Sequence, residues 1–266
     1  MRNPARSRSA SEKSVARGHE ALERGEWRAA RAAFEAALKI EEMPQALEGL
    51  GLAAWWQDDA RVVFDARERA YRLYRDRGDV RGAARVALWL NWDYAAFRGE
   101  ANVSNGWLER ARRLLDEIEP CAETGWVLYR EALRALRAER DSEKALRLAR
   151  EAAQLARTLE LHDIEVLAHS LEGLILVSRG EIAAGMKRLD EIATAIAGGD
   201  ILDRQVIGIA ICNLISGCER ARDYERAAEW CARLQRLPVR AVAGECAARG
   251  APCCAGGRTG SDCHVG

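Results

Sequence analysis

The sequence predicts an all-α fold in which about six helix pairs stack into a right-handed superhelical solenoid. The first observation behind this prediction is a polar turn that returns about every 41 residues after a shorter first step. The acidic residues of these turns are Glu26, Asp59, Glu100, Asp141, Glu181 and Asp223. The second observation is that small or apolar residues follow most turns at offsets of 4, 8 and 11, on one stripe of a helix. A fixed period of this size is typical of repeat proteins, whose units bury their apolar stripes against neighbouring units.

Six helix pairs fit between Val15 and Leu237. We expect them at 15–40, 43–77, 80–118, 122–158, 162–197 and 201–237. Each range holds two helices joined by one of the polar turns, and breakers such as Pro44, Gly78 and Pro120 separate the pairs. The first helices of the pairs are expected to line a concave groove.

Five of the pairs carry the stripe in their second helix. In chain order the stripe residues are Ala30, Phe34 and Ala37; Ser104, Leu108 and Ala111; Ala145, Ala149 and Ala152; Gly185, Leu189 and Ile192; and Ala227, Cys231 and Leu234. The second pair fits less well, because the residue at offset 8 from Asp59 is Arg67.

The two ends of the chain depart from the repeat pattern. Residues 1–14 are basic and lack apolar periodicity, which predicts a disordered leader. Residues 238–266 are rich in glycine and cysteine without a helical stripe, and we expect this tail to be out of frame or truncated. The alternatives are a flexible tail and a zinc site, although the adjacent Cys253 and Cys254 lack the spacing of zinc ligands. Truncation would expose an apolar face on the last pair, which predicts self-association or fraying there.

Composition argues against several classes of function. The 41 basic and 41 acidic residues cancel, so we expect no broad basic surface for nucleic acid. The sequence shows neither a long uncharged apolar run nor a signal sequence, which favours a cytoplasmic protein that does not bind membranes. Metalloprotease, phosphate-loop and nucleophile motifs are missing, so we expect no enzyme activity, cofactor or metal.

The first pair resembles the tetratricopeptide repeat family. Gly25, Ala30, Phe34 and Ala37 stand where the motif of that family has its glycine, alanine, aromatic residue and alanine. The resemblance implies closely packed helix pairs with the phenyl ring of Phe34 filling the space between units. The closing proline of the motif is present only loosely, so these are degenerate and elongated repeats.

A narrower resemblance covers residues 46–237. It is carried by the runs Leu47-Glu48-Gly49-Leu50-Gly51-Leu52-Ala53-Ala54-Trp55-Trp56, Gly82-Ala83-Ala84-Arg85-Val86-Ala87 and Asn105-Gly106-Trp107-Leu108-Glu109-Arg110-Ala111. These are similar to the repeat region of bacterial LuxR-type helix-turn-helix transcriptional regulators. The resemblance implies a sensor or interaction arm that recognises a protein segment or a small-molecule effector. No run resembles the recognition helix of that family, so DNA binding is not expected of this chain. The alternatives are a stand-alone scaffold and an accessory region of a cyclase or ATPase signalling protein.

The sequence also suggests groove contacts, for which packing or solvated surface is the competing interpretation. They are Glu48, Trp92, Asp93, Arg130, His169 and Glu172. Asp93 lies beside the aromatic residues Trp89, Trp92 and Phe97 and therefore needs solvent or an arginine such as Arg85 or Arg130. Glu48 and Glu172 occupy the same place in a repeated Leu-Glu-Gly-Leu run, where paired acids would suit a basic peptide.

Histidine and cysteine give no clear site in the repeat region. His162 and His169 lie seven residues apart on one helical face, too far for shared metal ligation without other donors. Cys212, Cys218 and Cys231 fall within expected helices and are interpreted as small buried hydrophobic residues.

Overall fold

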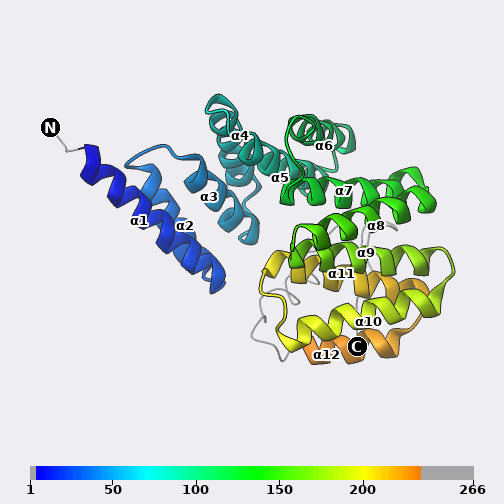
Figure 1. Ribbon diagram of the computed structural model, residues 1–266. Helices are drawn as coiled ribbons and strands as arrows, with labels where there is room; N and C mark the ends of the chain where they lie inside the picture. Colours follow the sequence, from blue (N-terminus) through cyan, green and yellow to red (C-terminus); the bar gives the residue numbers. More distant parts are fainter. Residues whose placement is uncertain (1–3, 235–266) are drawn as a thin grey trace. The chain divides into compact units, whose positions relative to one another are not determined.

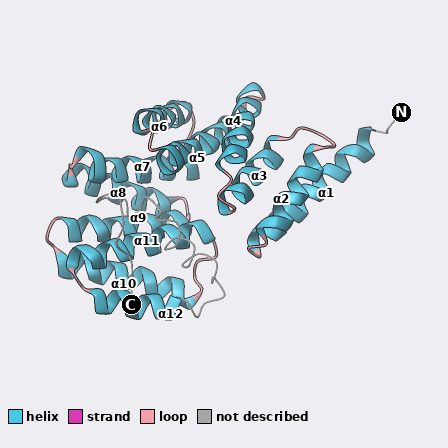
Figure 2. Ribbon diagram, turned by 180° about the vertical axis from the view of Figure 1, so that it is seen from behind, coloured by secondary structure: helices cyan, strands magenta, loops and turns pink. Residues whose placement is uncertain are grey.

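The computed structural model describes residues 4–234, and this part of the chain is helical without any strand (Figures 1 and 2). The helices of the first three pairs are α1 (Pro4–Glu23), α2 (Trp27–Leu38), α3 (Pro44–Trp56), α4 (Ala60–Asp76), α5 (Val80–Arg98) and α6 (Ala101–Leu115). Those of the remaining pairs are α7 (Ala122–Arg134), which continues as the π-helical turn η1 (Ala135–Glu139), α8 (Ser142–Thr158), α9 (His162–Ser178), α10 (Ile182–Gly198), α11 (Arg204–Ala221) and α12 (Tyr224–Leu234). The predicted all-α, tetratricopeptide-like array of helix pairs is therefore confirmed.

The expected disordered leader differs from the structure. Helix α1 begins at Pro4 rather than near Val15. A proline suits the first turn of a helix, because the N–H that it lacks would have no partner inside the helix there. Ser11 and Ser14 are buried, so the helix packs before the apolar pattern becomes visible in the sequence. The predicted tail, 238–266, lies outside the described residues.

The array divides into two compact units, Met1–Val127 and Leu128–Gly266. Unit 1 contains α1 to α6 and the beginning of α7, and unit 2 contains the rest of α7 and α8 to α12 among its described residues. The sequence predicts one array over 15–237 and gives no sign of this division. The predicted handedness of the superhelix stays a prediction.

The acidic residue of each recurring turn occupies the N-cap of the second helix. Asp59, Asp141 and Asp223 each accept a hydrogen bond from the backbone N–H three residues later, at 2.9–3.2 Å. Such a bond satisfies one of the donors that a helix start leaves open. Glu26 and Glu181 stand at the same place but form no side-chain cap. The recurring acid is thus a helix-start signal, and only aspartate provides the capping bond.

Close packing in the first pairs depends on Phe34, whose side chain is completely buried. Its ring lies between Gly18 of α1 and Gly49 of α3. A Cβ atom on Gly18 would come within 2.6 Å of the ring, and one on Gly49 would overlap the ring as well. The implied role of Phe34 as the residue that fills the space between units is therefore what the structure shows, and two glycines make room for it.

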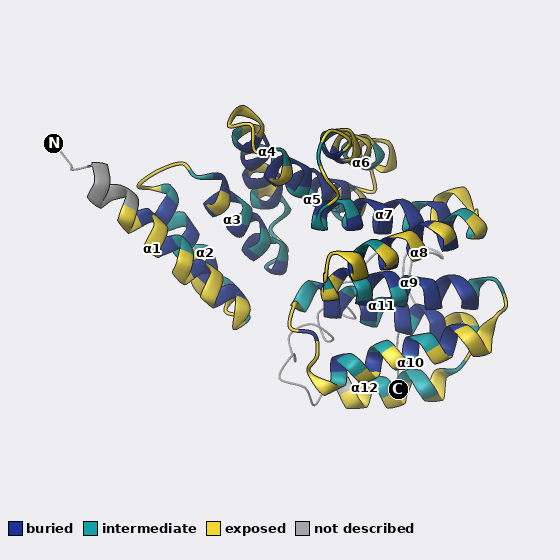
Figure 3. Ribbon diagram, viewed as in Figure 1, coloured by how far each residue is buried: buried dark blue, intermediate teal, exposed yellow. Residues whose placement is uncertain are grey.

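The stripe is buried in most pairs but not in the last (Figure 3). Phe34, Leu108, Ala149 and Leu189 are each at most 1% exposed. Cys231 is exposed, so its interpretation as a buried hydrophobic residue was wrong. The reason is its position on α12, the last helix described, which packs against α10 and α11. No described helix is both long and apolar enough to cross a membrane.

Candidate ligand pocket in unit 1

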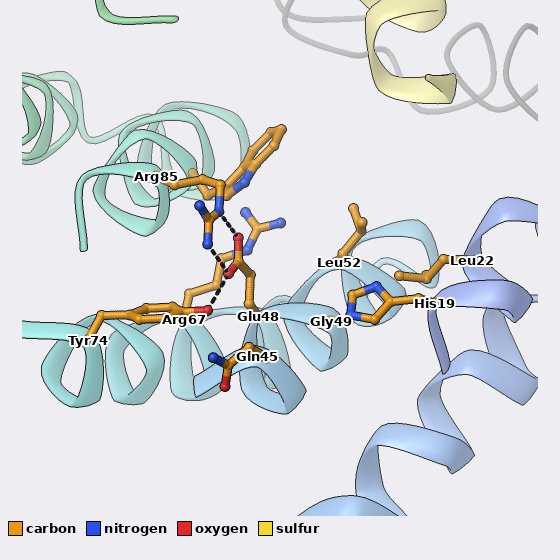
Figure 4. A pocket seen from close by; sticks show the side chains of 10 residues that line it. His19, Leu22, Gln45, Glu48, Gly49, Leu52, Arg67, Tyr74 and Arg85 are labelled. Carbon is orange, nitrogen blue, oxygen red and sulfur yellow. Dashed lines mark hydrogen bonds and ion pairs between the residues drawn. The ribbon is translucent and has the colours of Figure 1, made fainter. Parts of the chain in front are cut away.

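A pocket with a volume of about 300 Å³ opens among the first three helix pairs (Figure 4). Helices α1, α3 and α5 supply most of its lining, in agreement with a groove lined by first helices. The lining residues are His19, Leu22, Gln45, Glu48, Gly49, Leu52, Arg67, Tyr74, Arg85 and Trp89.

The polar end of the pocket is organised around Glu48. Arg85 donates to both carboxylate oxygens of Glu48, from Nε at 2.6 Å and from Nη2 at 3.0 Å. The hydroxyl of Tyr74 donates to Oε2 of Glu48 at 2.9 Å. Figure 4 shows Arg85 and Tyr74 converging on Glu48 from two sides. A two-point arginine–carboxylate pair of this kind fixes orientation as well as charge.

Arg85 continues the network to the start of α7. Its Nη1 donates to Glu123 at 3.1 Å, and Arg81 donates to the other oxygen of Glu123 at 3.1 Å. Glu123 is almost completely buried, whereas the side chain of Arg85 is 40% exposed. Arg85 therefore joins two carboxylates from different helix pairs while its side chain stays partly exposed.

The surroundings of Tyr74, Arg85 and Glu123 shift the pKa of each group away from neutral pH. Burial raises the pKa of Tyr74, and the charge of Glu48 raises it further, so the phenol stays a donor. The hydrogen-bonded Glu48 raises the pKa of Arg85 despite its burial. Burial alone would raise the pKa of Glu123, but the hydrogen bonds to its carboxylate, including that from Arg81, hold the pKa below its ordinary value. The pocket wall thus carries fixed charges and a neutral phenol.

The wall of the pocket also contains a buried ion pair between Arg67 and Asp93. Nη1 of Arg67 donates to both oxygens of Asp93, at 2.7 and 2.5 Å, and the two side chains are 1% and 0% exposed. The guanidinium carbon of Arg67 lies 5.1 Å from the ring centroid of Trp89. Gly51 makes room for Arg67, because a Cβ atom at Gly51 would lie 2.9 Å from its Cγ. Nε of Arg67 is buried without a hydrogen-bond partner.

This pair meets the expectation that Asp93 needs solvent or an arginine. Asp93 is buried, and its partner Arg67 is an arginine that the sequence analysis did not single out. Arg67 is the residue that interrupts the stripe of the second pair. That interruption was the available signal, since a charged residue at a buried repeat position requires a charged partner.

The other suggested groove residues are distributed over both units. Trp92 is half-buried on α5 and does not line the pocket, and Asp93 lies behind the lining. Arg130 is buried on the part of α7 that belongs to unit 2. His169 and Glu172 lie on α9, also in unit 2. Of the six residues, only Glu48 lines the pocket. No pattern in the sequence places His19, Gln45 or Tyr74 beside it.

Glu172 is the centre of a separate charged cluster in unit 2. It accepts from Nε of Arg150 at 2.8 Å and contacts Nδ1 of His169 at 3.3 Å, with Arg188 at 3.9 Å. The hydrogen bond with His169 lowers the pKa of Glu172 to about 2, and the hydrogen bond from Arg150 contributes to this shift. Burial acts in the opposite direction but is outweighed. His162 and His169 both approach Glu165 at 3.7 Å. In residues 4–234 no group of histidine, cysteine or acidic side chains could hold a metal ion.

These contacts change the interpretation of the paired acids. Glu48 and Glu172 share a place in the Leu-Glu-Gly-Leu run, but each is already paired with arginine. They also lie in different units. The glycine after each acid permits close packing in the structure. A Cβ atom at Gly173 would lie 2.8 Å from Cγ of Leu189, much as one at Gly49 would meet Phe34.

No family model matches this chain, and no curated protein matches it. Among solved structures, the chain is similar to a monomeric mutant of IFIT1 with Gppp-AAAA and to a further monomeric mutant of IFIT1 with m7Gppp-AAAA. Each comparison gives 18% sequence identity and a TM-score of 0.49. Each covers 79% of this chain but only 46% of the IFIT1 chain, so this chain spans less than half the length of those proteins.

Proposed function

We propose that this chain is a binding module and that the pocket of unit 1 holds its ligand. The observation that carries the proposal is the network around Glu48 at the mouth of the pocket. Arg85, Glu48 and Tyr74 fix one another, and the side chain of Arg85 is partly exposed. A few fixed polar groups beside apolar walls are typical of ligand sites.

A thermal-shift screen of purified protein against small molecules and short peptides tests the binding proposal. Leu52 lines the pocket and is half-buried, so Leu52→Trp should fill the pocket. The matched control is Leu114→Trp, at a half-buried leucine of α6 outside the pocket. Compounds that stabilise the wild type and the control, but not Leu52→Trp, would support the proposal. A screen in which Leu52→Trp retains every hit would overturn it.

We further propose that the module is the sensor or interaction arm of a LuxR-type transcriptional regulator. The supporting observation is the set of sequence runs that resemble the repeat region of that family. Its first run includes Glu48 and Leu52, which line the pocket, and the second run includes Arg85. In this proposal, the bound ligand would alter the helix array or its self-association and so influence a DNA-binding domain.

The regulator proposal has a direct genetic test. The gene is read beyond codon 237 in the other two frames. Further repeats followed by a helix-turn-helix would support a regulator whose frame has shifted. An unrelated sequence in all frames would favour a stand-alone scaffold and overturn this part of the proposal, without affecting the proposal that the pocket binds a ligand.

A further inference from the structure

The charges that surround the pocket of unit 1 cancel. Arg67 is paired with Asp93. Arg85 is paired with Glu48 and Glu123, and Arg81 is paired with Glu123. A ligand with a net charge of either sign would therefore leave one charge without compensation in a partly buried site. Such an arrangement is costly, because desolvated charges need partners. The balance favours a ligand without net charge.

The polar end nevertheless offers both a cation and an anion to a ligand. A guanidinium carries five N–H donors, and Arg85 uses three of them on Glu48 and Glu123, with a further contact to Tyr74. Its side chain is 40% exposed, so a ligand carboxylate can approach it. Glu48 is 21% exposed, and its Oε1 accepts from Arg85 alone among the side chains described around it. A ligand ammonium can donate to that oxygen.

The other part of the pocket contains apolar side chains. Figure 4 shows Leu22 of α1 and Leu52 of α3 on the side away from Arg85, with His19 beside Leu22. Trp89 adds an aromatic surface to the lining. The pocket therefore combines a polar end that carries both signs of charge with leucine side chains at some distance from it, within about 300 Å³.

We propose that this pocket binds a free α-amino acid with an apolar side chain. The carboxylate lies on Arg85, the ammonium group donates to Glu48, and the side chain packs between Leu22 and Leu52. This inference rests on the proposed binding function and specifies its ligand class. A zwitterion satisfies both charges without adding net charge, and the volume suits a molecule of this size. A peptide segment would carry only one of these two end groups into the pocket.

Calorimetric titration with three related probes tests the inference. L-Leucine carries both end charges, N-acetyl-leucine lacks the ammonium, and leucinamide lacks the carboxylate. We expect L-leucine to bind at least about tenfold more tightly than either derivative, because a charged hydrogen bond is lost in each case. L-Methionine and L-phenylalanine extend the test to other apolar side chains.

Two matched variants locate the binding. Glu48→Gln keeps the shape of the side chain but removes its charge, and should weaken binding of L-leucine by about tenfold. It should not weaken N-acetyl-leucine in the same way, since that probe has no ammonium to lose. Glu172→Gln makes the same change in the Leu-Glu-Gly-Leu run of unit 2 and should leave L-leucine binding unchanged. Circular dichroism melting of each variant confirms that it is folded.

The outcomes separate the inference from the proposed function. Each of the three apolar amino acids is titrated at about 10 mM, a concentration at which millimolar binding is detected. If none of them gives a heat of binding, the amino-acid inference is overturned. If other compounds still lose binding in Leu52→Trp, the binding module stands with a different ligand class. Equal binding of L-leucine and N-acetyl-leucine would also overturn the inference, because it would indicate a simple anion site on Arg85.

Discussion

The guanidinium of Arg67 and the carboxylate of Asp93 form an ion pair at 2.5 Å in the interior of unit 1, where neither side chain is more than 1% exposed. Arg67 occupies the repeat position at which other pairs have Phe34, Leu108 or Leu189. A buried ion pair thus replaces an apolar contact at one place in the array. Such pairs contribute little net stability compared with apolar packing, but they are costly to break.

Removing one member of this pair should destabilise the protein strongly. For Asp93→Ala we expect a loss of about 3–5 kcal/mol in the free energy of unfolding, because Arg67 would stay buried without its partner. The double variant Arg67→Met with Asp93→Leu should recover most of the loss, since it restores the apolar character of the stripe. Urea denaturation of the three proteins measures both effects. A double variant as unstable as Asp93→Ala would contradict this account.

The close fit of Phe34 against glycine makes a second prediction. Gly49→Ala should lower the free energy of unfolding by about 1–3 kcal/mol, because the added methyl group overlaps the ring of Phe34. Adding Phe34→Leu should reduce that loss. The control is Gly106→Ala on α6, where a Cβ atom would meet nothing within 4 Å. This change should stabilise the protein by about 0.5–1 kcal/mol, since alanine favours the helix.

The N-caps lead to a third prediction. Asp141 accepts a hydrogen bond from the backbone N–H of Lys144, so Asp141→Ala should cost about 1 kcal/mol. Glu181 stands at the corresponding place of the next pair without a capping bond, and Glu181→Ala should cost much less. Thermal melting of the two variants side by side provides the comparison. Equal losses would show that the acidic charge, rather than the capping bond, supports the helix start.

The lowered pKa of Glu172 predicts a pH dependence of stability. Its folded-state pKa of about 2 lies below the ordinary value of 4.5, so the carboxylate contributes stability at pH values above 4.5. This contribution is lost as the pH falls from about 4.5 through about 2. It amounts to at most about 3 kcal/mol, because one pKa unit corresponds to about 1.4 kcal/mol.

The measurement for Glu172 is urea denaturation between about pH 2 and about pH 7. This range runs from the folded-state pKa of Glu172 to neutral pH. In Glu172→Gln the fall in stability on this acid limb should be smaller than in the wild type. The control is Glu151→Gln, at an exposed glutamate of α8 whose side chain is 55% exposed. If both variants follow the wild-type curve, the ion pairs of Glu172 do not stabilise the folded state.

The fold could be predicted because the residues that specify each helix pair lie close together in the sequence. Turn residues, breakers and stripe offsets lie within one helix pair, so the second to fifth pairs follow closely from the sequence. The first pair does not, since α1 begins at Pro4 rather than near Val15. The contacts of the pocket are not local in this sense. The partners in these contacts come from different helices. A sequence separation of 26 residues lies between Arg67 and Asp93, and the same separation lies between Glu48 and Tyr74. No helical or repeat period selects that separation, so the sequence indicated an arginine partner for Asp93 without singling out Arg67.

The position of Phe34 between Gly18 and Gly49 has a consequence for how related sequences can differ. The three residues come from three helices, and the ring excludes any side chain at both glycines at once. A smaller residue at position 34 would remove the constraint on both other positions, whereas a larger residue at either glycine would require the ring to be lost. In an alignment of relatives, we therefore expect substitutions at positions 18, 34 and 49 to occur together.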